Sequence, residues 1–208
     1  MAIANGYATL SQVKAAARIT DTVDDDLLEL SIESASRMID QHCQRRFFTN
    51  GTETRVFVAQ NAFLCHIDDV AGTAITVKTS DDLDGVYDTT WTASDFQAEP
   101  LNRNVNGIDF PTTKLRAVGD YLFPVGWHRS NLGEAGVQVT GEFGFGTAVP
   151  SDVTHACIIS SLRLFKRFDS ALGVAGIGPD MGVVRVSRVD NDVAAILAPF
   201  RKNPIGVA

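Results

Sequence analysis

Hydrophobic residues recur at helical spacing in two long stretches, one near each end of the chain. In the first stretch they follow at steps of four and three: Leu28, Ile32, Ala35, Ile39 and Cys43. Acidic residues at 24–26 suit the positive N-terminal end of this helix. The second stretch begins after Pro150 and brings another set into line: Val153, Ala156, Cys157, Ser160, Leu164 and Phe168. The two stretches predict a central helical core.

The first long helix carries more apolar surface than one packing partner requires. Leu27, Leu30 and Met38 form a second stripe on it, so we expect the helix to be covered from two sides. A shorter helix is predicted ahead of it, because Thr9 and Gln12 have the spacing of a capping box at the start of "TLSQVKAAARI".

The period changes to two in the middle of the chain. The stretches "TETRVFVA", "AITVKTS" and "GVQVTG" alternate as strands do, and residues 99–136 are rich in Asn, Gly and Pro without a helical period. We therefore predict an α+β fold, in which two long helices and short N- and C-terminal helices form a core around a large β-rich insertion. The expected parts are residues 1–50, the insertion at 51–148, and 149–208 with a flexible loop and a terminal docking helix.

A glycine cluster stands at the expected return from sheet to helix. It consists of Gly141, Gly144 and Gly146, with Pro150 at the helix start. A phosphate site is disfavoured, because neither the GxxxxGK[ST] pattern nor a βαβ context is present. A sharp strand-to-helix turn, which glycine permits, explains the cluster better.

The charge of the chain limits its partners. The formal net charge is −7, and residues 1–150 hold 11 Lys and Arg against 20 Asp and Glu. Such a chain is poorly suited to neutralise nucleic-acid phosphates, although it could surround DNA without holding it. Without an apolar run of eighteen residues or a signal-peptide pattern, we expect no membrane association and synthesis in the cytoplasm.

Two patterns imitate metal sites. In "SDDLDGVYDTTW" four residues match the first, third, fifth and sixth places of a calcium loop: Ser80, Asp82, Asp84 and Gly85. The twelfth place is Trp91 instead of Glu, so an acidic hairpin tip is favoured and calcium stays open. Each cysteine has a histidine beside it, as in Cys65–His66, but adjacent side chains diverge, so we expect buried thiols and no zinc.

No catalytic pattern accompanies His128, since GxSxG and HExxH are both missing from the sequence. We predict no catalytic residues, no metal and no cofactor, and therefore a protein that is not an enzyme.

Four stretches carry a resemblance to a known family: residues 10–47, "VQVTGEFGFGTAVPSDVTHAC", "LFKRFDSALGVAG" and "VDNDVAAILAPFRK". In their order and spacing the chain resembles head-tail connector (adaptor) proteins of long-tailed bacteriophages and related gene transfer agents. The β insertion distinguishes it from shorter members.

The resemblance implies a structural protein of the virion neck, made in the host bacterial cytoplasm. It implies a homo-oligomeric ring, commonly twelvefold, between the portal protein and a stopper or tail-completion protein. DNA would pass through the channel of this ring without sequence-specific binding.

The resemblance also suggests roles for two segments. The terminal helix would dock on the portal through Val193, Ile196, Leu197, Phe200, Arg201 and Lys202, the alternative being that it packs on its own core. The preceding loop would become ordered on assembly, and it contains Gly173, Gly176, Gly178, Pro179 and Gly182.

Two other functions remain open at this stage. One is a β-rich ligand- or carbohydrate-binding module with helical supports, whose site would combine the acidic hairpin with Trp91, Tyr121 and Trp127. The other is a hydrolase of unknown type.

Overall fold

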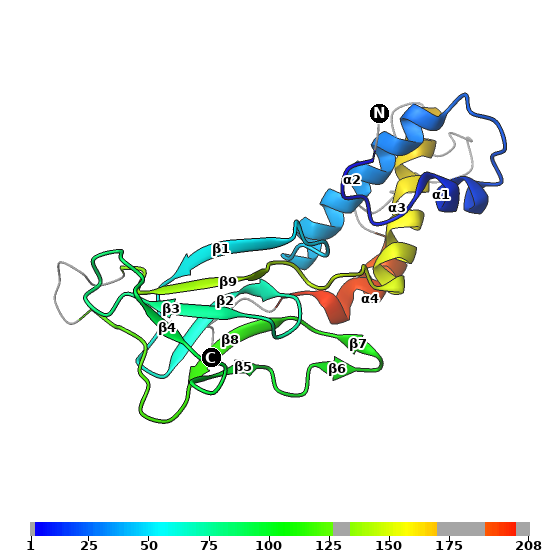
Figure 1. Cartoon of the computed structure of the whole chain (residues 1–208). Coiled ribbons are helices and arrows are strands. Elements are labelled where there is room, and N and C mark those ends of the chain that lie inside the picture. Colours follow the sequence, from blue (N-terminus) through cyan, green and yellow to red (C-terminus); the bar gives the residue numbers. More distant parts are fainter. Residues whose placement is uncertain (1–2, 127–133, 170–189, 203–208) are drawn as a thin grey trace, which may run out of the picture. The chain divides into compact units, whose positions relative to one another are not determined.

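The computed structural model describes residues 3–126, 134–169 and 190–202, and it has an α+β fold with antiparallel sheets (Figure 1). The chain divides into two compact units. We call Met1–Arg45 with Val149–Ala208 the helical unit, and Arg46–Ala148 the β unit.

The helical unit contains α1 (Leu10–Ala17), α2 (Asp25–Cys43), α3 (Ser151–Asp169), α4 (Asn191–Leu197) and the 3₁₀ turn η2 (Ala198–Phe200). The capping box predicted for α1 is confirmed: the Thr9 side chain accepts from the Gln12 amide, and the Gln12 side chain accepts from the Thr9 amide. Arg18 ends this helix in the left-handed conformation.

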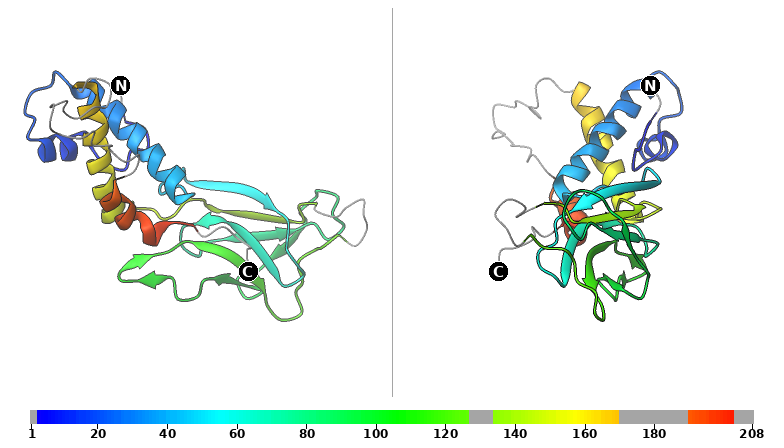
Figure 2. Two further views of the ribbon diagram at one scale, coloured as in Figure 1. Left: turned by 180° about the vertical axis from the view of Figure 1, so that it is seen from behind. Right: turned by 60° about the vertical axis from the view of Figure 1, so that its left-hand side comes forward.

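The predicted core face of α2 is also confirmed, because all five of its residues are buried: Leu28, Ile32, Ala35, Ile39 and Cys43. The helix packs along α3, and α1 contacts both (Figure 2). From α3, Val153, Ala156 and Cys157 enter the same core. The second half of α3 differs from the prediction, since Leu164 is only half-buried and Phe168 is 60% exposed.

The described residues of the β unit form these strands: β1 (Thr52–Phe57), β2 (Leu64–Val70), β3 (Thr76–Thr79), β4 (Thr89–Trp91), β5 (Phe96–Glu99), β6 (Asn104–Val105), β7 (Ile108–Asp109), β8 (Thr112–Ala117) and β9 (Val137–Glu142). They form sheets in the orders β1-β9-β3-β4, β2-β8-β5 and β6-β7. Every pair is antiparallel. Strands distant in sequence, such as β1 and β9, therefore lie side by side (Figure 1).

Side chains from the two larger sheets share one core. Val77 and Val139 come from the first sheet, and Cys65 and Leu115 from the second. Trp91 lies among them with its ring stacked on Phe123 at 4.6 Å between centroids. Its indole nitrogen donates to the Thr79 hydroxyl at 3.2 Å, which satisfies the one polar atom of the buried ring.

Strand β1 reverses the usual arrangement of polar and apolar side chains. Val56 is exposed, whereas Glu53 and Arg55 lie on the half-buried face. Arg55 binds Glu53 at 2.6 Å and Asp68 at 2.8 Å, and its guanidinium lies 4.3 Å from the centre of the Phe143 ring. The ion pairs compensate the partial loss of water, and the bonds from Arg55 and Arg46 hold the pKa of Glu53 below its ordinary value.

The glycine cluster at the end of β9 is less uniform than the sequence suggested. Gly141 lies inside the strand, where a Cβ atom would lie 3.0 Å from the side chain of Val70. Gly144 forms the turn: its φ is +150°, and a Cβ atom there would lie 2.3 Å from the Phe48 carbonyl oxygen. Around Gly146 a Cβ atom would meet only ordinary contacts, at 3.5 Å or more. Pro150 accepts from the Thr154 amide at 3.0 Å in the first turn of α3.

One hairpin was not predicted, although its signal is present. Strands β6 and β7 are joined by Asn106 and Gly107, which both have positive φ, as a two-residue type I′ turn requires. An Asn-Gly pair between Val105 and Ile108 is a strong local hairpin pattern.

Among the described residues, no helix has the length and apolar character needed to cross a membrane.

Candidate assembly surfaces

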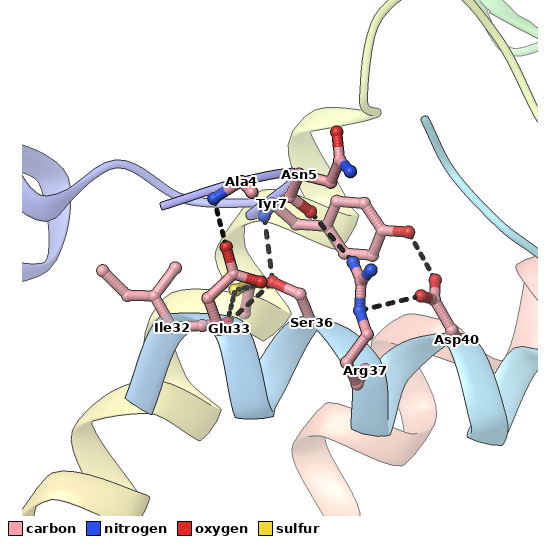
Figure 3. A network of polar contacts seen from close by, with 9 residues as sticks. Ala4, Asn5, Tyr7, Ile32, Glu33, Ser36, Arg37 and Asp40 are labelled. Atoms are coloured by element: carbon pink, nitrogen blue, oxygen red, sulfur yellow. Dashed lines mark hydrogen bonds and ion pairs between the residues drawn. The ribbon is translucent and has the colours of Figure 1, made fainter. Parts of the chain in front are cut away.

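The N-terminal segment is fastened to one flank of α2 by a polar network (Figure 3). The Tyr7 amide donates to the Ser36 hydroxyl at 3.0 Å, and the Tyr7 hydroxyl donates to Asp40. Arg37 donates to the Asn5 carbonyl at 2.9 Å and pairs with Asp40 at 3.2 Å. The sequence reasoning missed this contact, because a short coil without periodicity leaves no pattern. The network covers this flank of α2 with the chain's own residues.

The opposite flank of α2 is apolar and uncovered. Leu27, Leu30 and Met38 are 39%, 45% and 45% exposed. The chain thus covers α2 with α3 and with the N-terminal segment, but it leaves the second apolar stripe of the helix exposed. Leu30 lines a groove of about 330 Å³ together with Ser31, Ser34, Leu164, Arg167 and Phe168.

The C-terminal segment lies on its own helical unit. Asp190 caps α4 by accepting from the Asp192 amide at 3.1 Å, and its carboxylate lies 3.6 Å from Arg163. Three of the residues expected to dock on a portal are buried here: Val193, Leu197 and Phe200. The Lys202 amide donates to the Cys43 carbonyl at 2.8 Å. These contacts correspond to the alternative reading, in which the segment packs on its own core.

The other three predicted docking residues are less buried. Ile196 and Lys202 are half-buried, and Arg201 is exposed. Docking on a portal stays a prediction, and in this arrangement only these three side chains could take part. The assembly-ordered loop, with Gly173, Gly176, Gly178, Pro179 and Gly182, lies outside the described residues.

The acidic hairpin tip between β3 and β4 is held by its own hydrogen bonds. Asp81 accepts from the hydroxyls of Thr79 and Thr89, both at 2.9 Å. Bonds from the Val86 amide and the Ser80 hydroxyl hold the pKa of Asp84 below its ordinary value. The hairpin itself is confirmed. In the described part of the chain, no group of three His, Cys, Asp or Glu side chains could hold a metal ion.

All three cysteines are buried and free, as predicted. Burial raises the pKa of the Cys43 thiol to about 11 and that of Cys65 to about 12, and it raises the pKa of Cys157 as well. The thiols are therefore protonated and unreactive near neutral pH.

The aromatic site expected for a ligand-binding module is not formed by Trp91. This side chain is only 4% exposed and stacks on Phe123, so it belongs to the core of the β unit. Tyr121 lies 5.2 Å from the Trp91 ring and is partly exposed. Trp127 and His128 are outside the described residues.

Comparison with known proteins gives a consistent picture. Residues 7–80 match the family model of phage gp6-like head-tail connector proteins. A search of curated proteins found no significant match.

Three solved chains share the fold over 100% of this chain and 96% of their own length. They come from the neck of an empty gene transfer agent (GTA) particle computed with C6 symmetry (15% identity, TM-score 0.59), the neck of a native GTA particle computed with C12 symmetry (12%, 0.53) and the virion of a native GTA particle (16%, 0.55). The predicted resemblance to head-tail connector proteins is therefore confirmed by the family match over residues 7–80, and the three GTA chains share the fold of the whole chain.

Proposed function

We propose that the chain is a structural subunit of the neck of a phage or phage-like particle, where it connects head and tail. The observation that carries this proposal is the match of residues 7–80 to the connector family, together with a fold shared over the full chain with GTA neck structures. The role is architectural and has no catalytic step.

The subunits would form a homo-oligomeric ring beneath the portal and above the stopper or tail-completion protein. Symmetry favours this arrangement, because repeated head-to-tail contacts close into a ring when the rotation between subunits fits a full circle. The neck structures that share the fold were computed with C6 and C12 symmetry, and we propose twelve copies.

DNA would pass through the ring without being held. The chain has a net charge of −7, and a neutral to acidic channel wall would not bind phosphates tightly enough to stall the passing duplex. A continuous basic lining in the assembled ring would contradict this part of the proposal.

The C-terminal segment would face the portal with its outer side. Val193, Leu197 and Phe200 hold the segment on the helical unit, whereas Ile196 and Lys202 are half-buried and Arg201 is exposed. Basic side chains at the edge of a contact steer association with an acidic surface. Replacing Arg201 and Lys202 by Glu should leave the subunit folded and weaken its binding to portal-bearing heads.

Electron microscopy tests the proposal directly. The purified chain should form rings, alone or on portal-bearing heads, and labelled subunits should lie at the junction of head and tail. A chain that stays monomeric on intact heads, and is absent from finished particles, would overturn the proposed function.

A further inference from the structure

The two flanks of α2 differ in whether the chain itself covers them. Glu33, Ser36, Arg37 and Asp40 face the N-terminal segment and are engaged with it (Figure 3). At 100° per residue, the residues on the other flank are Leu27, Leu30, Ser34 and Met38. Three of these four are large apolar side chains left in water, which is the arrangement expected of a contact surface.

The groove on this flank adds depth to the surface. Leu30 forms one wall, while Leu164 and Phe168 of α3 form the other, and the two serines 31 and 34 lie between them. Phe168 is 60% exposed, although contact between a phenylalanine side chain and water is unfavourable in free energy. Aromatic and aliphatic residues around a depression are typical of the centre of a protein interface.

Charge suggests which part of a partner enters the groove. Arg167, near the end of α3, lines the groove beside Leu164 and Phe168. The chain around Val23 has the opposite character, with Asp21 and Asp24 beside it, while Asp25 at the start of α2 is already paired with Lys14 at 2.6 Å. Val23 is 86% exposed, so it does not fill the groove of its own unit.

We propose that the groove lined by Leu30, Leu164 and Phe168 binds residues 21–26 of a second copy of this chain. Val23 of that copy enters the groove, and the flanking carboxylates meet Arg167. Groove and acidic segment are different patches of one unit, so the contact is head-to-tail and repeats from copy to copy. That these contacts close into a ring rests on the proposed function. The apolar centre belongs to a larger interface, since stable contacts bury about 800 Å² per partner.

Disulfide crosslinking tests the contact, because the three native cysteines are all buried. A Val23→Cys, Phe168→Cys double variant should give a ladder of covalent multimers under mild oxidation of the assembled protein. The matched control pairs Val23→Cys with Leu101→Cys, an exposed leucine of the β unit, and should give no ladder. Intact rings without a ladder would overturn the inference and leave the proposed function standing. If the wild-type chain forms no ring even on portal-bearing heads, the proposed function fails and the inference fails with it.

Substitution provides a second, independent measurement. Leu30→Asp should raise the concentration needed for assembly at least about tenfold, while circular dichroism and thermal unfolding stay close to wild type. Leu101→Asp should assemble normally.

Charge reversal adds a test of register. Asp24→Lys and Arg167→Asp should each weaken assembly, and the double variant should recover part of it. If assembly is unchanged in Leu30→Asp and in both single reversals, the second copy does not use this groove.

Discussion

The helical unit and the β unit differ in which parts of the chain form them and in how their apolar side chains are covered. The helical unit is assembled from both ends of the chain, whereas the β unit is one continuous segment. In the helical unit one face of α2 is buried, and the N-terminal segment is hydrogen-bonded to one flank of the helix. The other flank is apolar and exposed. In the β unit the side chains of two sheets meet in one shared core. The β unit also exposes apolar side chains, such as Phe63 and Leu101, but on separate strands and loops. The difference teaches that exposed apolar residues indicate a partner surface more clearly when they follow one flank of a regular helix.

Stability should therefore be separable between the units. Both tryptophans, at positions 91 and 127, lie in the β unit, so their fluorescence reports that unit, while the circular dichroism of helices reports mainly the other. The division of the chain into two compact units predicts that residues 46–148 fold alone. A fragment without cooperative unfolding would show that the division is wrong.

The largest effect is expected at the core of the helical unit. Leu28 is fully buried, so Leu28→Ala should destabilise this unit by about 3 kcal/mol. Leu27→Ala, at the neighbouring exposed position, should cost far less. Unfolding followed by circular dichroism should show the difference, with a smaller shift in tryptophan fluorescence. Equal losses in the two variants would remove the distinction between the core and the uncovered flank.

A somewhat smaller effect is expected at the turn of the β unit. Gly144→Ala places a methyl group against the Phe48 carbonyl at a backbone angle that alanine rarely adopts, and should cost about 1–3 kcal/mol. Gly146→Ala is the matched control and should be nearly neutral, because its surroundings have room. Denaturant unfolding followed by fluorescence measures both. A neutral Gly144→Ala would show that the turn can relax.

The N-terminal cap should contribute less than either. Thr9→Ala removes the side chain that accepts from the Gln12 amide, which should cost about 1 kcal/mol. Thr9→Ser keeps the hydroxyl and should retain most of the stability. Thermal unfolding compares the two variants, and an equal loss in both would mean that the hydroxyl bond is not what matters.

The smallest effect concerns the thiols and appears only at high pH. The folded-state pKa values of Cys43 and Cys65 are raised above 9, so below about pH 9 both thiols are neutral in the folded and the unfolded chain. Their ionisation therefore does not change the free energy of unfolding in that range. Between pH 9 and their raised pKa values the unfolded thiols ionise first, and stability should fall in both units. Native protein at pH 8 should resist thiol reagents, and denatured protein should react at all three cysteines. Rapid reaction of the native protein would show that the thiols are accessible.

The sequence by itself determined the elements that depend on local pattern. The capping box at Thr9, the buried face of α2 from Leu28 to Cys43 and the hairpin around residues 80–88 follow from spacing and turn chemistry. The β6–β7 hairpin also belongs to this class, because its Asn-Gly turn is specified by two adjacent residues.

Only the tertiary structure decided which apolar residues are satisfied. Leu28 and Leu30 look alike in a helical pattern, yet one is enclosed by neighbouring helices and the other faces water. The same holds for Phe200, whose burial on its own unit depends on where the C-terminal segment returns, and for Trp91, which stacks on Phe123. Burial depends on contacts between residues far apart in the chain, and periodicity shows which face of a helix is apolar but not which neighbours cover it.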